Sequence, residues 1–218
     1  MAGDWVLFDL NGTLVDPGAI TATWPGGRGV ALSILDQAVM QAMVDTMTGQ
    51  FREFPGYLRA ALAHRAALVG LGDDAVEAGL HAAQALPPFP DAAQALGTLH
   101  DAGLHVGVLT NSAKDSAERT LEAAGLRDQV ETVLGADSVE AYKPDQRVYN
   151  RAFEELGLAA GEPWLVAGHW WDVAGAKRAG MRTAWVGRDE GALLPGVPAP
   201  DVLVADLASA AEKIAAAV

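Results

Sequence analysis

Hydrophobic positions along the chain fall into two alternating patterns. Short runs that are almost wholly apolar, typical of buried parallel strands, occupy 5–8, 105–109, 132–134, 164–167, 183–186 and 202–204. Between them, helical spacing covers 91–102, 113–124, 145–156, 172–179 and 206–217. Asp91, Asp145, Asp172 and Asp206 stand at the starts of these helices, where acidic residues are preferred. The alternation predicts an α/β fold with a doubly wound parallel sheet.

The segment 16–86 breaks this alternation, because its apolar residues follow helical spacing only. These residues are Leu32, Leu35, Val39, Met43 and Met47, then Leu58, Leu62, Leu68 and Leu71. The spacing of Met40, Met43 and Met47 favours contact with the core. We therefore predict a core of residues 1–15 and 87–218, with an α-helical insertion at 16–86. Because it follows the first strand, we expect it to cover the carboxyl edge of the sheet as a lid.

Composition narrows the range of partners. The 218 residues include 15 Lys and Arg against 28 Asp and Glu, a net charge of −13 that repels polyanions, so we expect no nucleic-acid partner. There is no cysteine, so disulfides, thiolate metal ligands and a cysteine nucleophile are excluded, which fits a cytoplasmic protein. We find no secretory signal pattern and no apolar run long enough to cross a membrane.

Polar residues follow four of the predicted strands. Asp9 ends the first strand and precedes a glycine turn, Leu10 to Thr13, whose backbone N–H groups can face an anion. Alone, Asp9 could simply cap a turn. Further clusters follow the second, third and fourth strands: Thr110, Asn111 and Ser112; Lys143 and Pro144; and Gly168 to Asp172. Because the carboxyl ends of parallel strands share one edge of a sheet, we expect these clusters to converge on one crevice.

Four motifs resemble, in order, those of the haloacid dehalogenase superfamily of aspartate-nucleophile hydrolases. They are FDLNGTLVD, VLTNS, AYKPDQRVYNRA and LVAGHWWDVAGAKRAGMRTAWVGR. The 2-haloacid dehalogenase branch is the most similar, since Tyr149 follows Lys143 by six residues and the fourth motif contains WDxxGAxxAG. The resemblance implies a Rossmann-like core, with the helical insertion as the cap of that branch.

The resemblance also implies residue roles. Asp9 would be the nucleophile that forms an aspartyl ester, and Lys143 would keep it ionised. Asp172 would act as general base or position the hydrolytic water, and Tyr149 would support this network. Thr13, the fifth catalytic candidate, would donate a hydrogen bond to Asp9 or to the substrate. The substrate-binding candidates are Leu10, Asn11, Thr110, Asn111, His169 and Trp171.

Two positions favour displacement of halide over hydrolysis of phosphate. Phosphatases of the superfamily carry a second Asp where this chain has Asn11, which cannot protonate a leaving alkoxide. They also carry a magnesium-binding Asp where this chain has Gly168. We therefore expect a hydrolase that acts on a small haloacid-like molecule without a metal or cofactor. A magnesium-dependent phosphatase for small phosphate monoesters and a catalytically silent binding protein are the alternatives.

Other positions depart from the haloacid dehalogenase pattern. Those enzymes carry an aromatic residue at the position of Asn11 and an arginine on the first cap helix that contacts the substrate. Anchoring the cap on Phe51 and Phe54 places Asp45 at the arginine position, where it would repel a carboxylate. Arg28 and Arg52 are possible substitutes.

Three further features have two interpretations each. His169 could shuttle protons or be a structural hydrogen-bonding residue. Trp170 and Trp171 could line an apolar pocket or pack the core against the lid. The apolar faces of the insertion could equally pack on a second copy of the chain, so a homodimer is one expectation.

Overall fold

The computed structural model describes residues 5–161 and 163–218, and its centre is a parallel sheet. Within these residues six strands pair in the order β3-β2-β1-β4-β5-β6, with every neighbouring pair parallel. The strands are β1 (Trp5–Phe8), β2 (His105–Thr110), β3 (Thr132–Gly135), β4 (Trp164–Ala167), β5 (Arg182–Val186) and β6 (Val202–Val204). The predicted doubly wound sheet is confirmed. Its strand order reverses at β1, so the end of this strand lies at the crevice where such sheets bind ligands.

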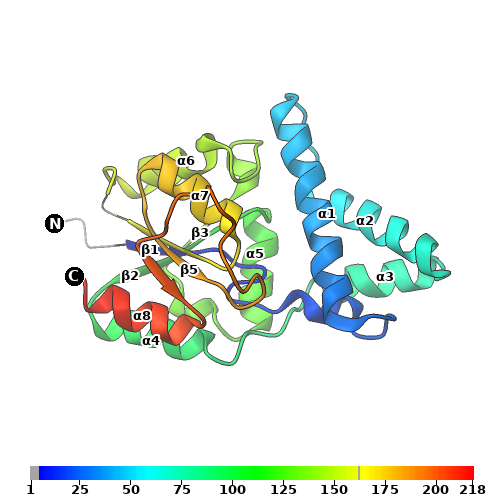
Figure 1. Cartoon of the computed structure of the whole chain (residues 1–218), viewed down its shortest axis with the longest axis horizontal. Helices are drawn as coiled ribbons and strands as arrows, with labels where there is room; N and C mark the ends of the chain where they lie inside the picture. The colour runs from blue at the N-terminus through cyan, green and yellow to red at the C-terminus, as the bar shows by residue number, and fades with distance from the viewer. Residues whose placement is uncertain (1–4, 162) are drawn as a thin grey trace.

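Helices cover both faces of the sheet. Helices α4 (Ala92–Asp101) and α8 (Leu207–Ala215) lie on one face, with α6 (Gln146–Leu156) and α7 (Trp170–Ala179) on the other (Figure 1). Helix α5 (Lys114–Ala123) follows β2, and short 3₁₀ turns occur at η2 (Arg127–Gln129) and η3 (Ala136–Ser138). Alternate residues of β1 serve the two faces: Val6 and Phe8 join the α4 and α8 core, whereas Leu7 joins the α6 and α7 core.

The acidic residues predicted at the starts of helices have different roles in the structure. Asp145 and Asp206 cap α6 and α8 by accepting hydrogen bonds from Arg147 N and Ser209 N. Asp91 precedes α4 without capping it, and its carboxylate accepts hydrogen bonds from Arg188 and the Leu207 backbone. Helix α7 begins at Trp170, two residues before the predicted start.

The insertion forms a helical group beside the sheet. It consists of the 3₁₀ helix η1 (Pro17–Thr21) and helices α1 (Gly27–Met47), α2 (Phe54–Val69) and α3 (Asp73–Ala82), which Figure 1 shows next to the core. Its two connections to the core run side by side. Asp16 N donates to Pro87 O at 2.8 Å, and Phe89 N donates to Leu14 O at 2.9 Å. The chain therefore enters and leaves the insertion through one paired segment.

The expected core contact of Met40 and Met47 is wrong. Met40, Met47 and Leu68 are 63%, 86% and 64% exposed. The buried side of α1 instead includes three alanines, Ala31, Ala38 and Ala42. Small side chains let a neighbouring helix approach closely, and helical spacing alone does not decide which stripe faces that neighbour.

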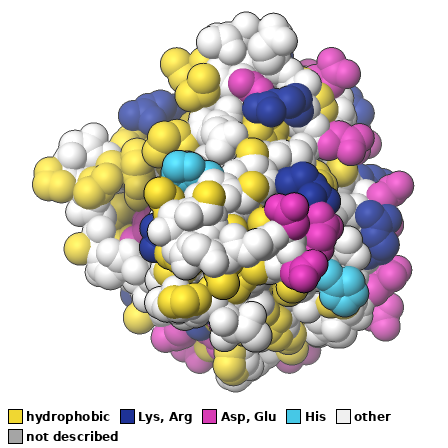
Figure 2. Space-filling model, turned by 90° about the vertical axis from the view of Figure 1, so that its right-hand side faces the viewer, with side chains coloured by type: hydrophobic (Ala, Val, Ile, Leu, Met, Phe, Trp, Pro, Cys, Tyr) yellow, Lys and Arg dark blue, Asp and Glu magenta, His cyan; other side chains and the backbone are white. Residues whose placement is uncertain are grey.

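The described surface is mixed in character. On the face shown in Figure 2, most acidic and basic side chains lie towards the right, and hydrophobic side chains are more frequent towards the left. No helix within 5–161 or 163–218 is both long enough and apolar enough to serve as a membrane span.

Leu7 and Leu68 provide a test of these assignments. Leu7 is fully buried in the central strand, so Leu7→Ala should lower the free energy of unfolding by about 2–5 kcal/mol, because it leaves a cavity. Leu68→Ala is the matched control and should change the free energy of unfolding by less than about 0.5 kcal/mol. Urea unfolding monitored by circular dichroism measures both. Equal losses would contradict the outward placement of Leu68.

Candidate active site

A buried lysine lies between two carboxylates at the carboxyl edge of the sheet. Asp9 directly follows β1, Lys143 precedes α6, and Asp172 lies in the first turn of α7. Lys143 Nζ is 3.3 Å from Asp9 Oδ1 and 2.7 Å from Asp172 Oδ2. Lys143 and Asp172 are completely buried, and Asp9 is almost so. The fold therefore brings together three of the predicted catalytic residues, which are 134 and 29 positions apart along the chain.

The charges of this triad stabilise one another against the cost of burial. Burial disfavours the carboxylate of Asp9, but the Lys143 ammonium and His169 outweigh this effect and lower the pKa of Asp9 to about 2. Burial likewise disfavours the ammonium of Lys143, but Asp172 and Asp9 raise its pKa. For Asp172, burial and the negative charge of Asp9 outweigh Lys143, so its pKa is raised. Asp9 is therefore more readily ionised than Asp172.

Tyr149 binds the carboxylate oxygen of Asp172 that Lys143 does not bind. Its hydroxyl donates to Asp172 Oδ1 at 2.8 Å, so both carboxylate oxygens of Asp172 have a partner. Burial and the nearby Asp172 carboxylate raise the pKa of Tyr149, which keeps the hydroxyl protonated as a donor. Gly175, one turn further along α7, makes room for this contact. A Cβ there would clash with the Tyr149 hydroxyl and lie 2.7 Å from Pro144 Cβ.

Thr13 fixes the other oxygen of Asp9. The Thr13 hydroxyl donates to Asp9 Oδ2 at 2.9 Å and accepts from Gly168 N at 2.9 Å. The turn that carries Thr13 uses Gly12 with a φ of 85°, a left-handed conformation that favours glycine. The motif NGT therefore places one hydroxyl between the first and fourth strand ends.

His169 and Trp171 form the wall next to Asp9. His169 precedes α7, its Nδ1 is 3.5 Å from Asp9 Oδ2, and its ring stacks on Trp171 with centroids 5.1 Å apart. The ring also lies against Gly12, where an added Cβ would be 2.7 Å from His169 Cε1. Burial works against the charged imidazole, but Asp9 and other carboxylates outweigh it, so the pKa of His169 is raised.

A small pocket opens above Asp9. The described residues that line it are Asp9, Asn11, Thr110, Asn111, His169 and Trp171 from the core, with Leu35, Val39 and Phe54 from the insertion. Asn111 accepts a hydrogen bond from Lys143 N through Oδ1, whereas its buried Nδ2 has no partner among the described residues. That amide therefore offers a donor to a bound molecule.

Most predicted binding residues line this pocket, but Leu10 does not. The Leu10 side chain is fully buried in the hydrophobic core, and its carbonyl accepts hydrogen bonds from Leu14 N and Val15 N. Asn11 lies at the pocket wall and donates to Ser112 Oγ at 3.2 Å. Thr110 accepts a hydrogen bond from Ser112 N through its hydroxyl.

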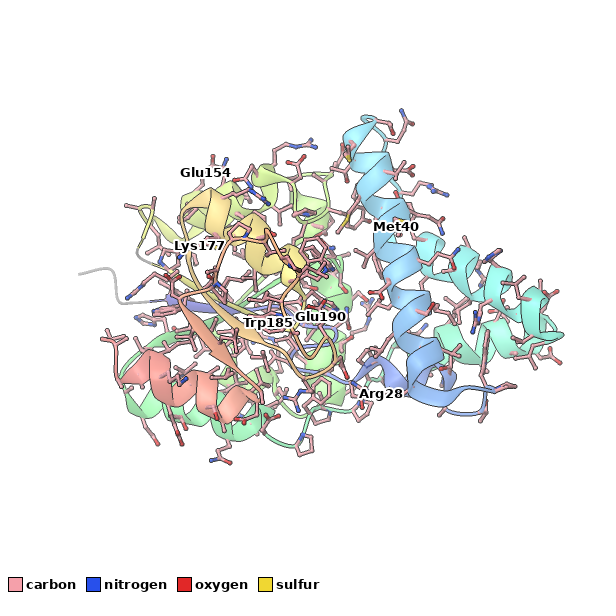
Figure 3. The ribbon with its side chains drawn as sticks, viewed as in Figure 1. Arg28, Met40, Glu154, Lys177, Trp185 and Glu190 are labelled. Atoms are coloured by element: carbon pink, nitrogen blue, oxygen red, sulfur yellow. The ribbon has the colours of Figure 1, made fainter. Side chains whose placement is uncertain are left out.

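The charged residues that were considered for substrate binding do not line the pocket. Asp45 accepts hydrogen bonds from Arg52 and from the Tyr57 hydroxyl, both at 2.9 Å. Arg28 pairs with Asp16 and Asp189 and so joins α1 to the loop after β5; Figure 3 shows it where α1 meets the core. The prediction that Asp45 would face the substrate is therefore not supported by the geometry.

The contribution of the insertion to the pocket was not predicted from the sequence. Leu35 and Val39 on α1 and Phe54 on α2 form its apolar wall. The spacing of these apolar residues indicates burial, but it does not distinguish a residue packed against the core from one that lines a binding site.

A larger cleft of about 1030 Å³ adjoins the pocket. It runs between the insertion and the start of α5, and it shares Asn11 and Phe54 with the pocket wall. Within the described part of the chain, no three His, Asp or Glu side chains are grouped so that they could hold a metal ion.

Comparison with known proteins identifies the family. Residues 4–180 match haloacid dehalogenase-like hydrolases. The chain belongs to the haloacid dehalogenase-like hydrolase family. It is 30% identical to an (S)-2-haloacid dehalogenase from Pseudomonas sp. strain YL, over 84% of this chain and 82% of that enzyme. It is 32% identical to the (S)-2-haloacid dehalogenase of Xanthobacter autotrophicus, over 84% of this chain and 74% of that enzyme.

Solved structures support the same assignment. The L-2-haloacid dehalogenase from Xanthobacter autotrophicus with chloropropionic acid covalently bound superposes with a TM-score of 0.87 and 26% identity. The match covers 97% of this chain and 98% of that structure. The resemblance inferred from the four sequence motifs is thus confirmed, and the fold of this family member is that of haloacid dehalogenases.

Gly175→Ala tests the packing that positions Tyr149. The added methyl group would meet the Tyr149 hydroxyl and Pro144, so we expect a loss of about 1–3 kcal/mol in the free energy of unfolding. Tyr149→Phe removes the hydroxyl, so the double variant should be less destabilised than the sum of the two single variants. Urea unfolding of the four proteins measures this coupling. Strict additivity would contradict the close approach.

Proposed function

We propose that this protein hydrolyses the carbon–halogen bond of a small 2-haloacid, with Asp9 as the nucleophile and without a metal. The observation that carries the proposal is a carboxylate held ionised by buried Lys143 at the base of a pocket with an apolar wall. Its relatives named (S)-2-haloacid dehalogenase support the reaction class.

In the first step, an Asp9 oxygen attacks the carbon that bears the halogen. A carbon–oxygen bond forms, the carbon–halogen bond breaks, and its electron pair leaves with the halide. Lys143 and Thr13 orient the attacking carboxylate through contacts at 3.3 Å and 2.9 Å. Because halide is a stable anion, no group has to protonate it.

In the second step, water hydrolyses the ester on Asp9 and releases a 2-hydroxy acid and a proton. Asp172 is our candidate to accept that proton, because its raised pKa makes it a stronger base than Asp9. Tyr149 and Lys143 hold it in place. Thr110, Asn111, Asn11, His169 and Trp171 would contact the substrate, whereas Leu10 would contribute only through its backbone.

The insertion would act as a cap in this reaction. We propose the division into a core of residues 1–15 and 87–218 and a cap of 16–86, supported by the paired connections at Asp16 and Pro87. Leu35, Val39 and Phe54 would then shield the ester from bulk water and receive the apolar part of the substrate.

The geometry at Gly168 argues against the phosphatase alternative. An Asp at this position would place its Cβ 2.6 Å from the backbone oxygen of Gly12. The backbone would have to shift before this position could supply a metal ligand. Asn11, which donates to Ser112, also cannot protonate a leaving alkoxide.

Parallel assays of halide and phosphate release test the proposal. Haloacetates, 2-halopropionates and phosphate monoesters are each incubated with magnesium and with EDTA. We expect halide release that persists in EDTA, because the proposed chemistry uses only side chains. Phosphate release that requires magnesium would favour the phosphatase, and no release in any assay would favour the silent binding protein.

Variants of the two central residues test the mechanism. Asp9→Asn and Lys143→Ala should each lower the rate of halide release by at least about 10³-fold, since the first removes the nucleophile and the second its counter-charge. Arg147→Ala is the control, because Arg147 pairs with Asp145 at the exposed start of α6. Rapid turnover by Asp9→Asn would refute covalent catalysis at Asp9.

A further inference from the structure

The pocket beside Asp9 contains one basic side chain. Among the described residues that line it, only His169 can carry a positive charge. Lys143 lies beneath the pocket, fully buried, and is bonded to both Asp9 and Asp172. The two arginines considered as substitutes for the missing cap arginine, Arg28 and Arg52, are paired with other carboxylates.

The charges at this site would repel an anionic substrate. With Asp9, Asp172 and Lys143 all ionised, the centre carries one excess negative charge. The carboxylate of a 2-haloacid adds another, in surroundings where water cannot screen the repulsion well. A positively charged partner would offset this repulsion, and the wall contributed by the insertion is apolar.

His169 is held rigidly and has unused capacity to donate a hydrogen bond. Trp171 stacks against one side of the ring, and Gly12 lies close to its edge. The Nδ1 atom is buried and makes no hydrogen bond to any described residue, although Asp9 Oδ2 is 3.5 Å away. The nitrogen is thus paired with Asp9 by charge but not by a hydrogen bond, which leaves its N–H available to an anion in the pocket.

The surroundings of His169 favour its charged form. Four carboxylates from different parts of the fold act on it, whereas Lys143, which is bonded to Asp9, carries a charge of the same sign as protonated His169. They are Asp9 after β1, Asp36 on α1, Asp172 on α7 and Glu190 after β5. Figure 3 shows Glu190 on the side of the core that faces α1. Burial opposes the charge, but these carboxylates outweigh it and raise the pKa of His169.

We propose that protonated His169 binds the carboxylate of the substrate and replaces the cationic residue that the insertion lacks. This inference rests on the haloacid function proposed above, and it specifies the substrate as a short monoanionic carboxylate. Since the charge belongs to an imidazole, affinity for the carboxylate should be retained below the raised pKa of His169 and lost as the pH rises through it.

A binding experiment separates this role from turnover. Propionate and its neutral isostere propionamide are titrated by calorimetry into the wild-type protein, His169→Gln and His64→Gln. His64 is exposed on α2, so its substitution is a matched control for loss of an imidazole. We expect His169→Gln to weaken propionate binding by about tenfold or more and to leave propionamide binding unchanged, because only propionate carries charge. His64→Gln should match the wild type.

The pH dependence provides a second measurement that does not depend on a variant. In the wild type, NMR titration of the histidine rings should show that bound propionate raises the pKa of one ring and that propionamide does not. In calorimetry, wild-type affinity for propionate should fall as the pH rises. His169→Arg, which keeps its charge throughout this range, should bind propionate without that fall.

Several outcomes would overturn the proposal. One is propionate binding by His169→Gln with wild-type affinity, and another is no propionate binding by the wild type. Equal weakening for propionate and propionamide would mean that the ring only shapes the pocket. His169-dependent propionate binding without halide release from any haloacid would instead refute the dehalogenase function and leave the carboxylate site standing.

Discussion

The burial of one lysine between two carboxylates is the constraint on which the rest of this structure depends. An ammonium without solvent is costly unless it is paired on more than one side, and Lys143 is paired with both Asp9 and Asp172. Each partner is fixed in turn: Thr13 binds Asp9, and Tyr149 binds Asp172. Gly175 and Gly168 allow the close approaches that these contacts need. Removing any member would leave a buried charge or donor without its partner.

The core and the insertion contribute different kinds of side chain to the site. The core supplies the ionisable groups that pair directly with Asp9, which are Lys143 before α6 and His169 before α7. The insertion supplies apolar side chains and closes the pocket. Its two arginines considered for substrate binding are used elsewhere, since Arg52 pairs with Asp45 and Arg28 contacts the core. This division leaves His169 as the core residue placed to face an anion.

Much of the core could be predicted from sequence. The six strands and the helices between them lie within a few residues of their predicted limits, because a buried parallel strand needs a continuous apolar run. The predictions for the insertion were poorer. Met40 and Met47 share the helical spacing of buried residues but face outward, since three alanines occupy the buried side of α1. The expected position of Asp45 near the substrate is also not supported, because its carboxylate accepts hydrogen bonds from Arg52 and Tyr57.

The sequence by itself determined the order of the strands along the chain, the polar residue at each strand end and the family. These features follow from local patterns and motif spacing, which are properties of neighbouring residues. Only the tertiary structure decided that Leu35, Val39 and Phe54 form the pocket wall, that Leu10 belongs to the core and that His169 lies 3.5 Å from Asp9. Such contacts depend on how the insertion packs against the sheet, and that packing is set by side chains far apart in the sequence.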